Sequence, residues 1–158
     1  MKIAASVALF ATAQASLNSF PKFDWFHASC ALNTVFHHSC ADTWEAISQA
    51  QLTKNDPASG TYGATETAQD DYLWFTRTTP VKHYVDDVLF MTRGADDGCE
   101  VISRSRSQSL SFYDYDTNFC NMYNIFRMTG LTFDEPKKDA DGCRWFPSNV
   151  HEDTCNKY

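Results

Sequence analysis

Alternating serine and arginine residues form the segment of this sequence best suited to binding chemistry. The run is Ser103-Arg104-Ser105-Arg106-Ser107-Gln108-Ser109. Side chains on a strand point alternately to opposite faces, so a strand here would separate the serines from Arg104 and Arg106. On a pocket wall, the two guanidinium groups could hold an anionic ligand group. On an exposed face, they would instead pair with carboxylates of a preceding strand, such as Asp86 and Asp87, and both interpretations stay open.

Three oxygen donors at alternate positions follow this run. Asp114, Asp116 and Asn118 are spaced like the start of a calcium-binding loop. Such a loop needs glycine at its sixth position and glutamate at its last, whereas Phe119 and Ile125 occupy those positions here. Because Asp and Asn side chains bond readily to nearby backbone, we interpret the segment as a turn and helix cap. We therefore predict no metal site.

Recognisable catalytic motifs are lacking. The histidines lie in no motif, and neither Gly-x-Ser-x-Gly nor His-Glu-x-x-His occurs. Asp86 and Asp87 are adjacent, so on a flat strand they point to opposite faces and cannot act as one acid–base pair. We predict no catalytic residue and no cofactor. A hydrolase that uses Asp86 or Asp87 with Arg104 and a nearby serine is the enzymatic alternative.

The start of the chain has the three parts of a secretory signal. Lys2 supplies the positive charge, residues 3–11 form an apolar run, and Ala13-Gln14-Ala15 places small residues before the cleavage site. The apolar run is shorter than the roughly 20 residues that span a bilayer. We predict a signal over residues 1–15, with cleavage after Ala13 as second choice, no membrane span, and one secreted domain over residues 16–158.

Six cysteines follow the signal, and an even number in an exported chain predicts three disulfides. Sequence alone permits many connectivities, and we expect neighbours to pair: Cys30 with Cys40, Cys99 with Cys120, and Cys143 with Cys155. Zinc bound by cysteines and nearby histidines is the alternative. It is disfavoured because no Cys-x-x-Cys pair occurs and thiolates pair with each other in an oxidising compartment.

The exported chain is acidic and rich in aromatic residues. Removing Lys2 with the signal leaves 12 basic and 20 acidic residues, a net charge of −8. Such a charge repels phosphate backbones, so nucleic acid is a poor candidate partner. Aromatic residues make up 15% of the chain, which predicts a core built on Phe, Tyr and Trp.

Helices are predicted at three places that would position these residues. Apolar residues at helical spacing indicate a helix over residues 26–39. A second helix begins at Asp42, which caps it, and ends before residue 55. A third is capped by Asp116 or Thr117, and its large apolar residues follow i, i+3, i+4 and i+7: Phe119, Met122, Tyr123 and Phe126.

Strands are predicted between the second and third helices. Aromatic and β-branched residues mark three of them, with a hairpin turn over residues 94–98: residues 72–78, 81–92 and 99–112. Residues 58–69 are predicted to form a loop, and the chain from residue 131 on is expected to be irregular except near Thr132. The order predicts an α+β domain, with a small antiparallel sheet of about three to five strands and two or three helices packed on it.

The strand and turn motifs together resemble an uncharacterised family, domain of unknown function 1499. The resemblance rests on Tyr84-Val85-Asp86-Asp87-Val88-Leu89-Phe90, on Arg104-Ser105-x-Ser107, and on Asp114-x-x-x-Asn118. The family's bacterial members have a Val-Asp-Asp-hydrophobic-x-Phe strand, a hairpin, an Arg-Ser-x-Ser-Arg strand, and an Asp-x-x-x-Asn turn that opens a helix. The similarity covers about residues 74–126. Here Gln108 stands where the family favours Arg, and the frame is rich in cysteine.

The resemblance implies no reaction, cofactor or catalytic residue. It does imply one polar cluster between sheet and helix, made of Asp86, Asp87, Arg104, Ser105, Ser107, Asp114 and Asn118. Arg106 joins these as a candidate because it lies in the same run.

Taken together, these features favour a secreted, non-catalytic domain. We expect it to bind a small or lipid-like ligand, or an extracellular partner surface, through the sheet, because aromatic richness beside a polar cluster suits a binding pocket. A structural protein of a coat or extracellular matrix, in which the polar cluster only holds the fold, is the first alternative. The hydrolase is the second.

Overall fold

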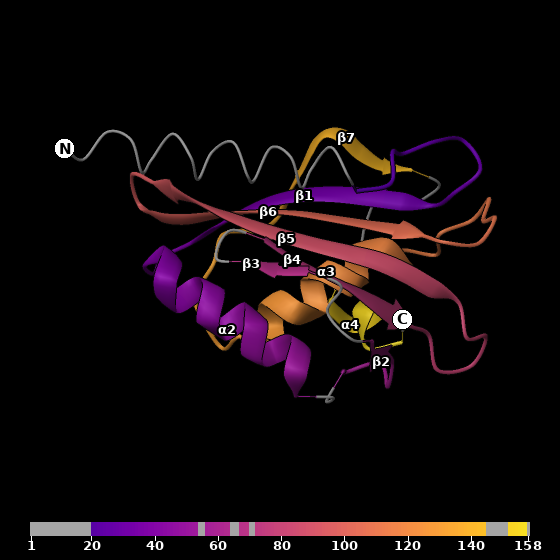
Figure 1. The fold of residues 1–158 in the computed structure, drawn as a ribbon, viewed down its shortest axis with the longest axis horizontal. Helices are drawn as coiled ribbons and strands as arrows, with labels where there is room; N and C mark the ends of the chain where they lie inside the picture. Colours follow the sequence, from indigo (N-terminus) through magenta and orange to yellow (C-terminus); the bar gives the residue numbers. More distant parts are fainter. Residues whose placement is uncertain (1–19, 54–55, 64–66, 70–71, 145–151, 158) are drawn as a thin grey trace.

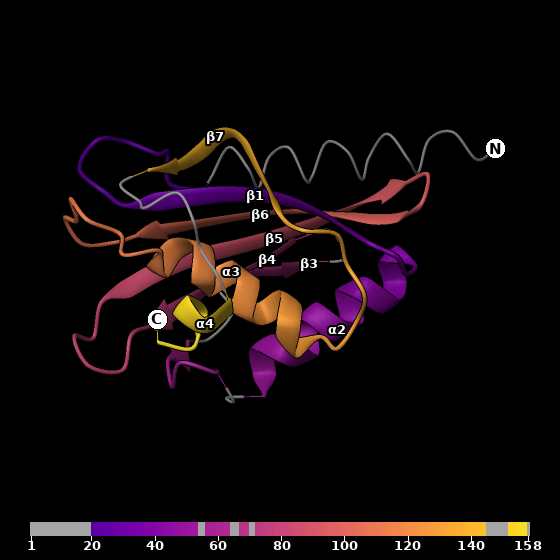
Figure 2. The same ribbon diagram turned by 180° about the vertical axis from the view of Figure 1, so that it is seen from behind.

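An antiparallel sheet runs through the protein, and the helices lie together on one of its faces (Figures 1 and 2). The protein is described by a computed structural model, which covers residues 20–53, 56–63, 67–69, 72–144 and 152–157. The predicted secretory signal and its cleavage sites lie outside the described residues.

In the part of the chain that the structure describes, the sheet has seven strands in the order β2-β4-β5-β6-β1-β7, with β3 also paired to β4. All the pairings are antiparallel. In chain order the strands are β1 (Ser29–Phe36), β2 (Thr61–Tyr62), β3 (Thr67–Gln69), β4 (Tyr72–Thr78), β5 (Val85–Ala95), β6 (Gly98–Ser107) and β7 (Lys137–Arg144). The α+β class is confirmed, whereas three to five strands were too few.

The described residues form three helices: α2 (Cys40–Leu52), α3 (Thr117–Met128) and α4 (Glu152–Cys155). The core between these helices and the sheet is aromatic, as the composition predicted. The ring of Phe126 on α3 lies 5.6 Å from that of Phe36 and 5.7 Å from that of Phe90, measured between centroids. Phe75 stacks on Phe90 from the next strand. Such ring pairs contribute beyond the area that they bury.

The opposite face of the sheet is covered by the segment that leads into β1. Phe20 is buried against Leu89 and Met91, and its ring lies 5.4 Å from that of Trp74. This second, smaller apolar cluster explains why β5 is buried on both faces over residues 88–91.

The predicted helix over residues 26–39 is wrong, because this region contains β1. The apolar spacing suggested a helix, but β1 lies between β6 and β7 and is buried on both faces over most of its length. A strand buried on both sides loses the alternation that identifies it in a sequence, so periodicity alone cannot separate it from a buried helix.

Other boundaries also differ from those predicted. β4 matches its predicted range, but β5 begins at Val85 rather than residue 81, and β6 ends at Ser107. Residues 58–69 contain two short strands, and β7 lies in a region expected to be irregular. The polar sequence of β7 carries no strand signal, because an edge strand can be solvated on its outer side. The cap of α2 is Ser39, whose Oγ accepts a hydrogen bond from the Asp42 backbone at 3.2 Å.

All six cysteines form disulfides, as predicted, but all three predicted pairs are wrong. The bridges are Cys30–Cys143, Cys40–Cys99 and Cys120–Cys155. Six residues of strand separate Cys30 from Phe36, a span of about 20 Å at roughly 3.3 Å per residue. Cys99 lies opposite Phe36, and Cys40 lies 4.8 Å from Cys99 between Cα atoms, so Cys30 and Cys40 are near opposite ends of β1. A Cα separation above about 7 Å prevents a bridge, so these two cysteines cannot meet once β1 has paired with β6. The bridges also leave no thiolate for the alternative zinc site.

Among the described residues, the structure contains no helix with the length and apolar character needed to cross a membrane.

Peptide mapping under non-reducing conditions should recover three linked peptide pairs that join Cys30 to Cys143, Cys40 to Cys99, and Cys120 to Cys155. Replacing both Cys40 and Cys99 by alanine should lower the free energy of unfolding by about 2–4 kcal/mol, because the bridge restricts the unfolded chain. A peptide that links Cys30 to Cys40 in the native protein would contradict the register of β1.

Candidate functional site

A buried ion pair anchors the polar groups between the sheet and α3. Arg77 on β4 is fully buried, and its Nε and Nη2 donate to the Asp56 carboxylate at 2.7 and 3.0 Å. Gly60 passes so close that a Cβ there would lie 2.7 Å from the guanidinium carbon. Burial alone would raise the pKa of Asp56, but its hydrogen bonds and ion pair with Arg77 outweigh burial and lower it. The same ion pair raises the pKa of Arg77 against the opposing effect of burial.

The Asp56 carboxylate is fully satisfied by further donors. It accepts from the backbone of Ala58 at 2.7 Å, from the backbone of Gly60 at 3.2 Å, and from the Tyr62 hydroxyl at 2.7 Å. Burial, together with the charge of Asp56, raises the pKa of Tyr62. A buried charge needs this many partners because desolvation is otherwise costly.

Asn121 on α3 connects Arg77 by hydrogen bonds to polar side chains in the centre of the sheet. Its Oδ1 accepts from Arg77 Nη1 at 2.9 Å, while its Nδ2 donates to Asp86 Oδ2 at 2.9 Å and to Ser105 Oγ at 3.0 Å. Ser107 Oγ then donates to Asp86 Oδ1 at 2.7 Å. Asp86 and Ser107 meet because they are directly opposite in the β5–β6 register.

Asn118 extends the chain of hydrogen bonds to the start of α3. It lies one turn before Asn121, so both side chains face the sheet. Its Nδ2 donates to Asp114 Oδ1 at 2.7 Å and to Ser107 Oγ at 3.3 Å, and its Oδ1 accepts from Ser105 Oγ at 2.7 Å. We call these connected residues the polar network: Asp56, Arg77, Asp86, Ser105, Ser107, Asp114, Asn118 and Asn121.

Asp114 caps α3 in place of the predicted Asp116 or Thr117. Its Oδ1 accepts from the Asn118 backbone at 3.1 Å. Asp116 occupies the position before the helix, but it has a φ of 64° and its side chain makes no cap hydrogen bond. The predicted turn-and-cap interpretation is confirmed, with a different carboxylate as the cap.

Three of the predicted site residues lie on the other face of the sheet. Asp87 accepts from Trp74 Nε1 at 3.2 Å and from Gln108 Nε2 at 3.1 Å. Arg106 donates to Asp24 at 2.9 Å, and the Arg104 guanidinium lies 5.7 Å from the centre of the Phe23 ring.

Alternation along β6 therefore separates the arginines from the serines, as expected. The expected pairing of these arginines with Asp86 and Asp87 is wrong. The structure brings together five of the residues that we expected to form one polar cluster: Asp86, Ser105, Ser107, Asp114 and Asn118. The other three, Asp87, Arg104 and Arg106, lie outside this cluster.

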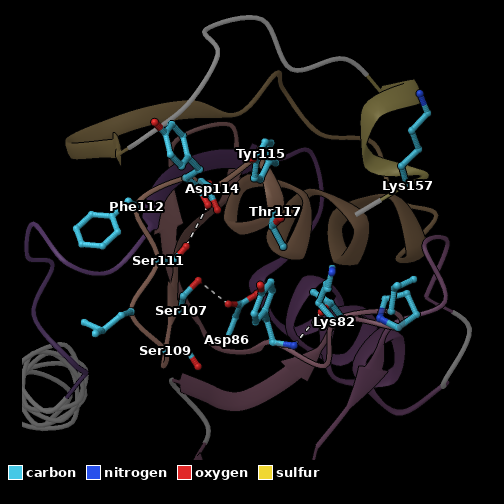
Figure 3. A pocket seen from close by; sticks show the side chains of 16 residues that line it. Lys82, Asp86, Ser107, Ser109, Ser111, Phe112, Asp114, Tyr115, Thr117 and Lys157 are labelled. Atoms are coloured by element: carbon cyan, nitrogen blue, oxygen red, sulfur yellow. Dashed lines mark hydrogen bonds between the residues drawn. The ribbon is translucent and has the colours of Figure 1, made fainter.

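A pocket of about 610 Å³ opens where β6 ends and the chain turns towards α3 (Figure 3). Asp86, Ser107 and Asp114 of the polar network line it. Six of the nine large apolar side chains exposed among the described residues also line it: Val81, Tyr84, Leu110, Phe112, Tyr113 and Tyr115. We call these six residues the apolar rim. Lys82 and Lys157 add two cations to the lining.

The two carboxyl groups of the pocket have unusual protonation behaviour. Burial raises the pKa of Asp86, although hydrogen bonds from Asn121 and Ser107 oppose the shift. Burial raises the pKa of Asp114 to about 7, with the charges of Asp86 and Asp116 adding to the shift. Asp114 Oδ2 is buried and has no hydrogen-bond partner among the described residues.

Backbone strain is concentrated at the edge of this pocket. Tyr115 and Asp116 are consecutive residues with left-handed φ angles of 49° and 64°, and His83, between the lining residues Lys82 and Tyr84, has a φ of 56°. A left-handed tyrosine costs roughly 1–2 kcal/mol. Such strain persists where the surrounding structure holds it, and it occurs often at ligand sites.

The sequence interpretation missed Arg77, Asp56 and Asn121. For Arg77 a signal existed, since alternation within the predicted strand puts it on the same face as Leu73 and Phe75, where a charge needs a partner. Asn121 could have been found from its spacing of three residues after Asn118. Asp56 carried no local signal, because its role depends on a contact with a distant strand.

Comparison with known proteins identifies a family. The family described as "Protein of unknown function (DUF1499)" matches residues 10–127, about three quarters of the chain. This match confirms the resemblance found in the strand and turn motifs. No curated protein and no solved structure matches the chain.

Replacing Arg77 with methionine should lower the free energy of unfolding by about 3–5 kcal/mol, because Asp56 would be left buried without its counter-charge. Arg93→Met is the matched control, since Arg93 is also a strand arginine paired with a carboxylate, Glu100, but its side chain is 56% exposed. That control should cost less than about 1 kcal/mol. Urea unfolding measures both, and equal losses would contradict the central role of the buried pair.

The raised pKa of Asp114 predicts a pH-dependent contribution to stability. Between its ordinary value of 3.8 and about 7, the unfolded carboxyl is ionised while the folded one keeps its proton, so unfolding releases a proton. This contribution to stability is therefore lost as the pH rises. Asp114→Asn retains an oxygen for the α3 cap and removes the titration. Relative to the wild type, the free energy of unfolding of the variant should rise by at most roughly 4 kcal/mol between pH 4 and 7. Urea unfolding measures this difference, and a difference that stays constant with pH would contradict the prediction.

Proposed function

Since the chain belongs to the uncharacterised DUF1499 family, its pocket is the best guide to activity, and we propose that the protein is a secreted, non-catalytic domain that binds a small amphipathic ligand there. The observation that carries this proposal is the gathering of the apolar rim around a pocket with a polar floor. Exposed apolar patches of this kind mark binding sites on proteins that otherwise bury such surface.

The pocket has the size and composition of a small-molecule site. Its volume of about 610 Å³ falls within the range of roughly 300–1,000 Å³ that is common for ligand pockets. The apolar rim supplies surface for a hydrocarbon or aromatic body, and Leu110 is 71% exposed. Covering such side chains with a ligand removes apolar area from water and favours binding.

The polar floor supports fixed positioning of a ligand head group. Asp86 and Ser107 are held by hydrogen bonds within the polar network, and Asp114 is held by Asn118. These side chains are therefore preorganised, so that binding need not order them.

A structural role alone explains the polar network but not the apolar rim. Arg77, Asp56 and Asn121 are buried and satisfied, which suits residues that stabilise the fold. The apolar rim contributes little to a folded core, because its side chains are largely exposed. We therefore favour binding over a coat or matrix protein that uses the polar network only for stability.

A hydrolase is the second candidate, and the pKa of about 7 for Asp114 favours it, because a general acid or base works best near the ambient pH. We favour binding because the Ser107 hydroxyl is already engaged on both sides. It donates to Asp86, as a nucleophile would to a base, but its oxygen also accepts from Asn118 and the residue is 8% exposed, so it is poorly placed to attack a substrate.

Export fits the covalent structure. Three disulfides join distant parts of the chain, which is typical of proteins that fold in an oxidising compartment. The signal predicted over residues 1–15 supplies the route.

Nile red, a neutral dye that fluoresces in apolar surroundings, should bind the disulfide-bonded protein and lose about threefold to tenfold in affinity in Leu110→Ala. Leu52→Ala is the matched control, because Leu52 is 61% exposed on α2 and lies outside the pocket lining. It should bind as the wild type does. Equal affinities for both variants would place the dye elsewhere and contradict the proposed pocket.

A further inference from the structure

The floor of the pocket holds a buried acceptor that needs a hydrogen-bond donor. Asp114 is 3% exposed, and its Oδ1 accepts two hydrogen bonds from Asn118, while its Oδ2 accepts none from the described residues. Buried polar atoms in folded proteins nearly always have a partner. Because Asp114 lines the pocket, a ligand can supply the missing donor.

The second carboxyl group on the floor favours a cationic donor. Asp86 also lines the pocket, and its two oxygens receive only neutral donors, Ser107 and Asn121. Arg77 reaches Asp86 only through Asn121. Two carboxyl groups thus face one cavity without a direct ion pair among the described residues.

The lysines of the lining do not neutralise this floor. Neither Lys82 nor Lys157 forms an ion pair with Asp86 or Asp114 in the described part of the chain. Figure 3 shows Lys157 beside α4, across the view from Asp114. An anionic head group at the floor would meet two acids, whereas a cation there would meet two possible counter-charges.

The apolar rim also suits a cation. Tyr84, Phe112, Tyr113 and Tyr115 contribute aromatic rings, whose faces attract positive charge. The chain as a whole carries a net charge of −7, which raises the local concentration of cations.

We propose that the pocket selects primary amines with an apolar body, the ammonium group binding Asp114 Oδ2 and Asp86 at the floor and the body lying against the apolar rim. This inference rests on the proposed binding function and names its ligand class. A primary ammonium fits better than a quaternary one, because only the former has N–H donors for Asp114 Oδ2.

Proton binding competes with the amine. The charged or titratable groups around Asp114 are Asp86 from β5, Asp116 from its own turn, Lys82 from the β4–β5 loop, Lys157 after α4, and the rim tyrosines. With the pKa of Asp114 at about 7, its carboxyl loses its proton between pH 6 and 8. A primary amine stays protonated in that range, since alkylammonium groups like that of lysine titrate near pH 10. Binding therefore strengthens as the pH rises.

Calorimetric titration of the full disulfide-bonded protein tests the head group directly. The probes are decylamine, decyltrimethylammonium, decan-1-ol and decanoate, which share one hydrocarbon body, at pH 6, 7 and 8. We expect decylamine to bind tightest, at least about tenfold tighter than decanoate at pH 8, and severalfold tighter at pH 8 than at pH 6.

Asp114→Asn identifies the residue responsible. The variant should lose about tenfold in affinity for decylamine and keep its affinity for decan-1-ol, because it removes the negative charge and leaves the apolar rim. Asp134→Asn is the matched control, since it removes one carboxylate that pairs with His37 outside the pocket lining. It should bind decylamine as the wild type does.

The outcomes separate the inference from the function on which it rests. Equal binding of all four probes, tightest binding of decanoate, or decylamine binding independent of pH would overturn the amine proposal and leave an amphipathic pocket. Binding of none of the four would overturn the proposed function as well. Should Asp114→Asn fail to fold, the probe comparison and the pH series on the wild type still decide.

Discussion

The buried contact between Arg77 and Asp56 is the interaction on which the other polar groups depend. Arg77 satisfies Asp56 with one side of its guanidinium and orients Asn121 with the other. Asn121 in turn fixes Asp86, and so α3 is held in one register on the sheet. A buried charge pair adds little stability over an apolar substitute, but it penalises every arrangement in which one partner is missing. Its contribution here is therefore the uniqueness of the packing beneath the pocket.

Predictability of the fold from the sequence varied with how each element is buried. β4 alternates between buried and half-buried residues, and α3 carries large apolar residues at helical spacing, so their periodicity is clear, and they were placed correctly within a residue or two. β1 is covered on both faces and β7 is a polar edge, so neither shows alternation. The pairing of Cys30 with Cys40 was wrong for the same reason, because it assumed a helical turn where Cys30 lies on a strand.

Whether a site residue could be predicted depended on whether its contacts are local in the sequence. Local motifs identified Asp86, Ser105, Ser107, Asp114 and Asn118, which form contacts within one hairpin and the helix that follows it. Asp56 and the rim residue Val81 become relevant only when the chain folds, since nothing near them in sequence indicates their neighbours. Alternation correctly separated the arginines from the serines. It could not show that the segment before β1 would cover the arginine face, where Asp24 pairs with Arg106.

The disulfide between Cys30 and Cys143 has a consequence for the order of folding. Its partners are 113 residues apart, so if the chain is exported from its N-terminus, as we propose, β1 waits for almost the whole protein before its covalent link can form. Cys30 and Cys40 emerge first, and an oxidase would join them into a non-native bridge that blocks β1. Maturation then needs thiol exchange, which takes seconds to hours without an efficient isomerase. Yield in a heterologous host should therefore be governed by isomerase capacity more than by oxidising power.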